Sequence, residues 1–253
     1  MSKLTIKDLV VFITGANREK GIGRALVEEA LKRGAKKVYA TARDVSQLDG
    51  LVQKYEGRVV AVGLDVTNPE QIQKAVQEAG DTQVLINNAG VAGFSGCIFN
   101  YDEKAARQEF EVNCFAPLHL MNAFSDSLIK NGNGAIVNVV SIAGLASFPL
   151  AATYSASKAA LHSLTRAARI EMARHGVPVF GVYPGPIDTD MAARVEAFKE
   201  SPANLAGRVF DGMEAGVEDI TTDPLADAFA GYLKEDPVAA EAMKKEFGSG
   251  NHH

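Results

Sequence analysis

Short apolar runs alternate with longer amphipathic stretches along most of the chain. The apolar runs are rich in β-branched residues and predict buried strands over residues 9–14, 37–41, 59–65, 84–87, 135–141 and 178–183. Apolar residues recur at helical spacing over residues 23–33, 69–79, 103–129 and 152–175. This alternation is typical of βαβ units with right-handed crossovers. It predicts an α/β fold, a doubly wound Rossmann-type parallel sheet of six to seven strands with helices on both faces.

The pattern loosens after residue 183. Residues 184–217 contain three prolines and four glycines among scattered apolar side chains. A long, weakly patterned segment in a compact domain often covers a substrate site, with plain disorder as the alternative, so residues 185–217 are predicted to form a substrate lid. Residues 217–221 are a candidate for a short last strand.

Composition favours one domain that acts on a small molecule. The chain has 253 residues, 47% of them hydrophobic, and shows no linker or repeat, so residues 1–253 are expected to form a single domain. The net charge of −5 is modest and the basic residues are dispersed, which argues against nucleic-acid or membrane-surface partners. No apolar run approaches the roughly 18 residues of a membrane span, and the first is too short for a signal peptide, so we expect a cytoplasmic protein.

The cysteines and the terminal histidines are not expected to form a functional site. Cys97 and Cys114 fit no metal-ligand spacing and are expected to be free packing residues, so no metal is predicted. His252 and His253 are interpreted as a remnant of a purification tag.

Three polar residues predict a site for proton transfer. Tyr154 and Lys158 are four residues apart in a helical stretch, so they share one face, and an ammonium beside the phenol would lower its pKa. Ser141 ends an apolar run, which places its hydroxyl at the carboxyl end of a buried strand, where open α/β sheets bind ligands. The structural alternative for the Tyr–Lys pair is a half-buried ring with a solvated amine.

A glycine turn follows the first predicted strand. The glycines between a strand and a helix N-terminus let the backbone approach a pyrophosphate, although they do not match the strict G-x-G-x-x-G pattern and glycine also simply ends strands. The candidate cofactor contacts in this turn are Gly15, Asn17, Arg18, Lys20, Gly21, Ile22 and Gly23.

The end of the second strand indicates the type of cofactor. An acidic residue about 20 positions after the glycines would hold the 2′-hydroxyl of NAD, whereas an arginine can accept the 2′-phosphate of NADP. Ala42 occupies the acidic position and Arg43 follows it, while Arg18 and Lys20 add positive charge. NADP(H) is therefore favoured over NAD(H), the alternative being that Arg43 is a solvated loop residue.

Two further strand ends carry candidate cofactor contacts. Asp65, with Val66 beside it, could accept a hydrogen bond from the adenine amine or simply cap the following turn. The Asn-Asn-Ala-Gly segment 87–90 supplies Asn88, Ala89 and Gly90, which could hold a tight turn against a ligand or only hold the turn.

From about residue 10 to residue 191 the chain resembles the short-chain dehydrogenase/reductase family, in its single-domain branch of carbonyl reductases and alcohol dehydrogenases. The resemblance rests on the glycine turn, Asp65, segment 87–90, Asn113, Ser141, the Tyr154–Lys158 pair and Pro184-Gly185 followed by Thr189. It implies that Tyr154 is the acid/base, Ser141 orients the carbonyl, Lys158 holds the nicotinamide ribose and Asn113 shapes a water-linked proton relay. It also implies cofactor contacts at Pro184, Gly185, Ile187 and Thr189, and a homodimer or homotetramer.

The chain departs from the family pattern in two places. Five residues, 16–20, separate Gly15 from Gly21 where the family usually has three, so the placement of Arg18 and Lys20 is less determined. The usual C-terminal strand that ends in a glycine pair is also missing.

The expected activity is hydride transfer between a nicotinamide and a ketone or secondary alcohol, with reduction of a hydrophobic ketone favoured because the predicted pocket is apolar. The alternatives are a nucleotide-sensing protein without catalysis and an epimerase or dehydratase that recycles its hydride. Ordinary core packing is the alternative role for every predicted pocket residue. These residues are Phe94, Ile142, Leu145, Phe148 and Met191, with Val195, Phe198 and Met213 from the lid segment.

Overall fold

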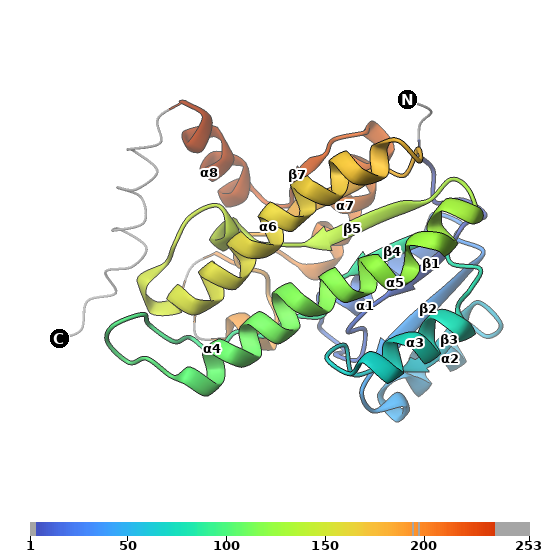
Figure 1. Ribbon diagram of the computed structural model, residues 1–253, viewed down its shortest axis with the longest axis horizontal. Coiled ribbons are helices and arrows are strands. Elements are labelled where there is room, and N and C mark those ends of the chain that lie inside the picture. The colour runs from blue at the N-terminus through green and yellow to red at the C-terminus, as the bar shows by residue number, and fades with distance from the viewer. Residues whose placement is uncertain (1–3, 194, 197, 236–253) are drawn as a thin grey trace.

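Seven parallel strands form one sheet in the order β3-β2-β1-β4-β5-β6-β7 in the computed structural model, which describes residues 4–193, 195–196 and 198–235 (Figure 1). The chain reverses its direction of travel across the sheet between β1 and β4, which are neighbours. The predicted doubly wound fold is confirmed. The strands are β1 Val10–Ile13, β2 Lys37–Ala42, β3 Val59–Gly63, β4 Val84–Asn87, β5 Ala135–Val139, β6 Val179–Tyr183 and β7 Asp219–Thr221.

Helices cover both faces of the sheet, which explains why the strands read as continuous apolar runs. Successive residues of β1 point to opposite faces: Val11 and Ile13 pack under one group of helices, whereas Val10 and Phe12 pack under the other. The first group is α1 Ile22–Lys32, α2 Asp49–Lys54 and α7 Pro202–Ala215. The second group is α3 Pro69–Glu78, α5 Ala116–Lys130 and α6 Ala152–Ala173.

The predicted helix 103–129 consists of two helices. α4 Glu103–Phe110 and α5 are joined by a π-helical turn, Glu111–Phe115, which precedes Pro117. Such turns interrupt regular helices and frequently occur at functional sites. This turn contains Asn113, which has no exposed surface.

Part of the predicted lid is a packed helix. α7 begins after Ser201, whose Oγ accepts a hydrogen bond from the Asn204 N–H at 3.1 Å, and ends at Gly216, which takes the left-handed conformation with φ 72°. Met213 is buried in the core under α1 and α7, so the prediction that it lines a pocket is wrong. The lid remains a prediction for the chain between β6 and α7, where residues 194 and 197 lie outside the described residues.

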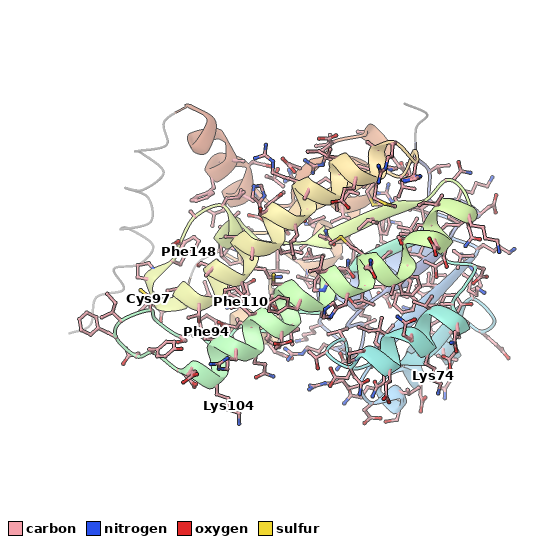
Figure 2. All side chains as sticks on the ribbon, viewed as in Figure 1. Lys74, Phe94, Cys97, Lys104, Phe110 and Phe148 are labelled. Atoms are coloured by element: carbon pink, nitrogen blue, oxygen red, sulfur yellow. The ribbon has the colours of Figure 1, made fainter. Side chains whose placement is uncertain are left out.

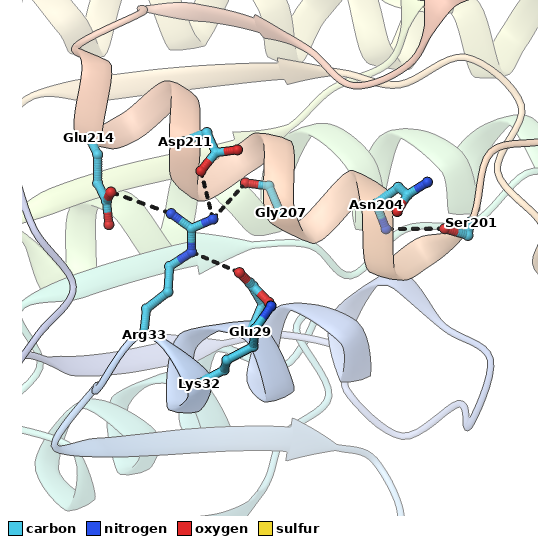
Figure 3. A network of polar contacts seen from close by, with 8 residues as sticks. All are labelled: Glu29, Lys32, Arg33, Ser201, Asn204, Gly207, Asp211 and Glu214. Atoms are coloured by element: carbon cyan, nitrogen blue, oxygen red, sulfur yellow. Dashed lines mark hydrogen bonds and ion pairs between the residues drawn. The ribbon is translucent and has the colours of Figure 1, made fainter.

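One arginine joins α7 to α1 (Figure 3). Arg33 donates to the carboxylates of Glu29 at 2.8 Å and Asp211 at 2.7 Å, and to the Gly207 carbonyl oxygen at 3.2 Å. Glu214 lies 3.4 Å from the same guanidinium. Side chains from two helices distant in sequence therefore meet on a single planar donor.

The C-terminal part of the sheet and the two cysteines can also be compared with their predictions. The candidate strand at 217–221 is confirmed as β7, and α8 Pro224–Glu235 follows it. Cys114 is buried as expected, whereas Cys97 is exposed and does not pack in the core. In the described part of the chain no helix combines the length and hydrophobicity needed to span a membrane. His252 and His253 lie outside the described residues.

Candidate active site

The predicted site residues gather at the carboxyl edge of the sheet, around the point where the strand order reverses. Gly15, Asn88, Ser141 and Pro184 follow β1, β4, β5 and β6, which are consecutive neighbours in the sheet. Parallel strands all end at the same edge, so these four positions lie on one side of the molecule. This is where open α/β sheets bind ligands.

Ser141 is held at the start of a short 3₁₀ turn, Ile142–Gly144. Its Oγ accepts a hydrogen bond from the Ala143 N–H at 3.1 Å and donates to the Pro184 carbonyl oxygen at 3.4 Å. The bond to Pro184 is long, so it constrains the hydroxyl only weakly. The hydroxyl therefore joins the loops after β5 and β6 and could turn towards a ligand.

Tyr154 and Lys158 share one face of α6, as predicted. The Lys158 ammonium lies 5.8 Å from the centre of the Tyr154 ring. It donates a hydrogen bond to the Val139 carbonyl oxygen at 2.8 Å, and only 4% of Lys158 is exposed. The alternative of a solvated amine is wrong for this pair.

The pKa of Tyr154 is raised, not lowered as the sequence predicted. Burial of the phenol raises it to about 12, the negative charge of Glu109 acts in the same direction, and the Ser141 hydroxyl opposes both. The Lys158 charge is directed at the Val139 carbonyl oxygen, and burial lowers the pKa of Lys158 to about 8. Without a ligand, the phenol therefore holds its proton firmly, which suits a proton donor.

Asn113 ties the loop after β4 to α6. Its amide nitrogen donates to the Val91 carbonyl oxygen at 2.8 Å and to Ser157 Oγ at 3.0 Å, while its amide oxygen accepts from the Val91 N–H at 2.9 Å. A Cβ atom on Gly90 would lie 3.3 Å from Asn113 Oδ1 and 3.6 Å from Lys158 Nζ. Asn113 is therefore beside Lys158, and its role in a water relay remains a proposal.

The glycine turn and the Asn-Asn-Ala-Gly segment support each other. Asn88 donates from its side chain to the carbonyl oxygens of Thr14 at 2.8 Å and Gly15 at 3.1 Å. Thr14 Oγ1 accepts from the N–H groups of Asn88 and Ala89, each at 2.9 Å. A Cβ atom on Gly23 would lie 2.3 Å from the Gly15 carbonyl oxygen, so only glycine fits there.

This cradle fits the pyrophosphate of a dinucleotide. Gly21 precedes α1 and has no side chain that could cap the helix, so the N-terminus of α1 can accept an anion. Arg18 lies 4.0 Å from Asp190, which connects the glycine turn to the loop after β6. Asn17 donates to the Gln47 side-chain oxygen at 2.7 Å.

Asp65, shortly after the end of β3, has one of its two predicted roles, and its contact with an adenine amine remains a prediction. Asp65 accepts hydrogen bonds from the Thr67 N–H at 2.9 Å and hydroxyl at 2.7 Å, so it does cap the turn that includes Val66. Burial acts to raise the pKa of Asp65, but the Thr67 bonds and the charge of Arg43 outweigh it, and the pKa is lowered. Arg43 is exposed beside this carboxylate, where an adenosine phosphate could reach it.

The loop after β6 is fixed by a carboxylate that the sequence analysis missed. Asp223, which is 2% exposed, accepts a hydrogen bond from the Gly185 N–H at 2.8 Å. Ile187 is buried, and its carbonyl oxygen accepts from the Thr189 hydroxyl at 3.3 Å. These bonds fix the loop that contains the predicted cofactor-binding residues, and their contacts with a cofactor remain a proposal.

Some of the predicted pocket residues pack in the interior, and others are partly or largely exposed. Ile142 is buried, and it packs with Leu145 and Phe148 against α8, so the alternative of core packing describes Ile142. Phe94 and Phe148 lie at the same end of the molecule, near the exposed Cys97 (Figure 2). Met191 and Val195 are partly exposed, and Phe198 is 73% exposed.

Glu109 is the other buried carboxylate that sequence reasoning missed. It has no exposed surface and contacts the residue before Tyr154. No sequence signal could have found it, because helical spacing does not distinguish a buried glutamate from an exposed one.

Comparisons with known proteins agree with this arrangement. The family described as short chain dehydrogenase matches residues 9–200. A ketoacyl reductase, HetN, of Nostoc is 28% identical over 264 residues, which cover 96% of this chain and 91% of that protein.

Two solved structures share the fold over nearly the whole chain. A short-chain dehydrogenase of Burkholderia cenocepacia in complex with NADP is 40% identical with a TM-score of 0.89, covering 95% of this chain and 98% of the other. A short-chain dehydrogenase/reductase of Burkholderia phymatum in complex with NAD is 26% identical with a TM-score of 0.81, covering 94% and 96%.

Proposed function

Because the chain belongs to the short-chain dehydrogenase family and is an oxidoreductase of that family, we propose that it reduces the carbonyl group of a hydrophobic ketone with NADPH. The reverse reaction would oxidise the corresponding secondary alcohol. The observation that carries the proposal is Tyr154, a partly buried phenol that keeps its proton, beside the Ser141 hydroxyl and the Lys158 ammonium.

A bound nicotinamide cofactor would supply the hydride for the carbonyl carbon. Ser141 would donate a hydrogen bond from Oγ to the carbonyl oxygen and polarise it. Tyr154 would donate its hydroxyl proton to the same oxygen as negative charge develops there. Lys158, whose pKa is about 8, is a cation at neutral pH and would stabilise the phenolate that remains.

The cofactor would lie across the carboxyl edge of the sheet. Its pyrophosphate would meet the glycine turn and the N-terminus of α1, and its nicotinamide would lie near Lys158 and the loop after β6. Arg43 beside Asp65 favours NADP, and the NADP complex of the Burkholderia cenocepacia relative supports that preference.

Steady-state assays with NADPH and NADH against aryl and alkyl ketones test the proposal. We expect absorbance at 340 nm to fall with at least one ketone, and Tyr154→Phe to fold and bind cofactor but lose nearly all turnover. The matched control is Tyr55→Phe, because Tyr55 directly follows α2 and packs, partly buried, against the core outside the site. Wild-type rates in Tyr154→Phe would remove Tyr154 from the mechanism.

The same assay separates the alternatives. An epimerase or dehydratase would form product without a net change in NAD(P)H absorbance. A sensor would bind the cofactor and turn over none of the ketones.

A further inference from the structure

Glu109, on α4, is a buried carboxylate with two short hydrogen bonds. Its Oε1 accepts from the Gly93 N–H at 2.6 Å, and its Oε2 accepts from the Thr153 hydroxyl at 2.5 Å. The residue has no exposed surface, and both of these partners are uncharged. Distances this short are typical of hydrogen bonds to an ionised carboxylate.

The two partners belong to different walls of the site. Gly93 lies in the segment that follows β4, and Thr153 directly precedes Tyr154 in the first turn of α6. A Cβ atom on Gly93 would lie 2.6 Å from Ala105 Cβ, so this backbone packs tightly on α4. Glu109 therefore joins the segment after β4, α4 and the start of α6 at one point.

The Glu109 bond is the shortest that the Thr153 side chain makes. Thr153 Oγ1 also lies 3.4 Å from the Ser95 carbonyl oxygen, and the Thr153 N–H is 3.3 Å from the same oxygen. Both of these contacts are long. The carboxylate is therefore the strongest of these three contacts, and the Phe148 N–H, which donates to Ser155 Oγ at 3.1 Å, is a further contact to the first turn of α6.

We propose that Glu109 is a positioning residue for Tyr154: it anchors the first turn of α6, and its negative charge keeps the proton on the phenol until a carbonyl is bound. The inference deepens the proposed function and rests on Tyr154 being the proton donor. Among the described residues, the charge of Glu109 from α4 acts on this phenol, the Lys158 ammonium of its own helix lies 5.8 Å from the ring centre, and the neutral Ser141 hydroxyl is beside it.

Burial is the largest cause of the raised pKa of Tyr154, and the charge of Glu109 is a smaller cause that acts in the same direction. Lys158 is turned to the Val139 carbonyl oxygen at 2.8 Å. Removal of the Glu109 charge alone should therefore make the phenol easier to ionise. Removal of the whole side chain should also release the first turn of α6.

Two substitutions separate charge from anchoring. Glu109→Gln keeps an acceptor for Gly93 and offers an amide donor to the Thr153 oxygen, so kcat at pH 7 should stay within about threefold of wild type. The pH above which its kcat/KM for ketone reduction declines should be lower than in the wild type, by on the order of one pH unit. Glu109→Ala loses both bonds, and kcat should drop on the order of tenfold or more while cofactor KM changes little.

Asp81→Asn is the matched control. Asp81 also accepts from a tyrosine hydroxyl, that of Tyr39 at 2.9 Å, but it precedes β4 and so lies at the opposite end of the sheet. Its kcat and pH profile should equal those of wild type. A Glu109→Gln variant with an unshifted profile would overturn the proposal, even if Glu109→Ala fails to fold.

A titration without turnover separates this inference from the proposed function. Phenolate absorbance near 295 nm is compared between the wild type and Tyr154→Phe, and between Glu109→Gln and the double variant, which isolates Tyr154 from the other tyrosines. A shift to lower pH with no ketone activity would retain the Glu109–Tyr154 coupling and reject the ketone reductase. An unshifted titration together with activity would reject only the role of Glu109.

Discussion

The Lys158 ammonium is buried with few groups that could stabilise its charge. Only 4% of the residue is exposed, and its ammonium donates a hydrogen bond to one neutral acceptor, the Val139 carbonyl oxygen. Burial of a charge with one neutral partner is unfavourable. A ligand that offers further oxygen acceptors, such as the hydroxyls of a ribose, could therefore bind this ammonium tightly.

This placement predicts a pH dependence of stability. The pKa of Lys158 is about 8 in the folded protein against its usual 10.5, so between these values the unfolded chain holds a proton that the folded chain has released. The free energy of unfolding without cofactor should therefore rise with pH across this window, by at most about 3 kcal/mol relative to Lys158→Met. Urea unfolding from pH 7 to 10 measures the difference.

Lys37→Met is the control for that titration. Burial acts to lower the pKa of Lys37, but its bonds to Asp81 and Tyr39 outweigh it and the pKa is raised. Its contribution to stability is therefore lost only as the pH rises through that higher value, above the window. If Lys158→Met runs parallel to wild type as Lys37→Met should, the buried ammonium is not the cause.

Arg43 carries the prediction about coenzyme preference. A guanidinium bound to a phosphate contributes roughly 1.5–3 kcal/mol, so Arg43→Ala should raise the KM for NADPH on the order of tenfold to a hundredfold and that for NADH much less. Lys36→Ala removes a positive charge from the other end of β2 and should change neither value. Equal effects of Arg43→Ala on both coenzymes would discard the phosphate contact.

The sequence determines some of these residues better than others. Spacing alone places Tyr154 and Lys158 on one face, and a strand end places Ser141 near them, so this cluster could be predicted. Glu109 could not, because the helical pattern marks an exposed and a buried glutamate alike. Ile142 and Phe148 show the same limit, because an apolar residue letter does not separate core from pocket. The direction of the Tyr154 pKa shift follows chiefly from burial of the phenol, which spacing does not determine.

At the scale of elements, α7 is the longest helix that the sequence analysis did not predict. Its apolar residues follow a proline-rich and glycine-rich stretch, which is typical of loops, although Pro202 is in fact at the first turn, where proline is tolerated. The strands, in contrast, could be predicted to within two residues because both of their faces are covered. The helix has a partner far away in sequence, and no local pattern contains that information.

Docking of α7 on α1 predicts an uneven effect of two neighbouring substitutions. The Arg33 side chain is 19% exposed and donates to acceptors on both helices, whereas the Lys32 side chain is 77% exposed and pairs with Glu29 alone. Arg33→Met should lower the free energy of unfolding by about 1–3 kcal/mol, because the Gly207 carbonyl oxygen and Oε1 of the largely buried Glu29 both lose their donor. Lys32→Met should change it by less than about 0.5 kcal/mol. Urea unfolding measures both, and equal effects would show that the network in Figure 3 does not hold α7.

At the scale of the whole molecule, one sheet joins two apolar cores. Every strand from β1 to β6 contributes residues to both faces or lies between strands that do, so neither core can open without loss of the other's backbone support. The single-domain organisation, which we propose for residues 1–253, then requires one cooperative unfolding transition. Tyr39 on β2 and Tyr183 on β6 report on opposite halves of the sheet.

Labelling the tyrosines with 3-fluorotyrosine tests this cooperativity, since the chain has six tyrosines and ¹⁹F signals can be assigned by single Tyr→Phe variants. The Tyr39 and Tyr183 signals should vanish at the same urea concentration. NADPH at a hundred times its Kd should stabilise the fold by about 2.7 kcal/mol and move both midpoints together, because the ligand would contact loops from both halves. Two separated midpoints would divide the chain into independent units. A shift of the Tyr39 midpoint alone would mean that the cofactor engages the glycine turn without the loop after β6, where hydride transfer has to occur.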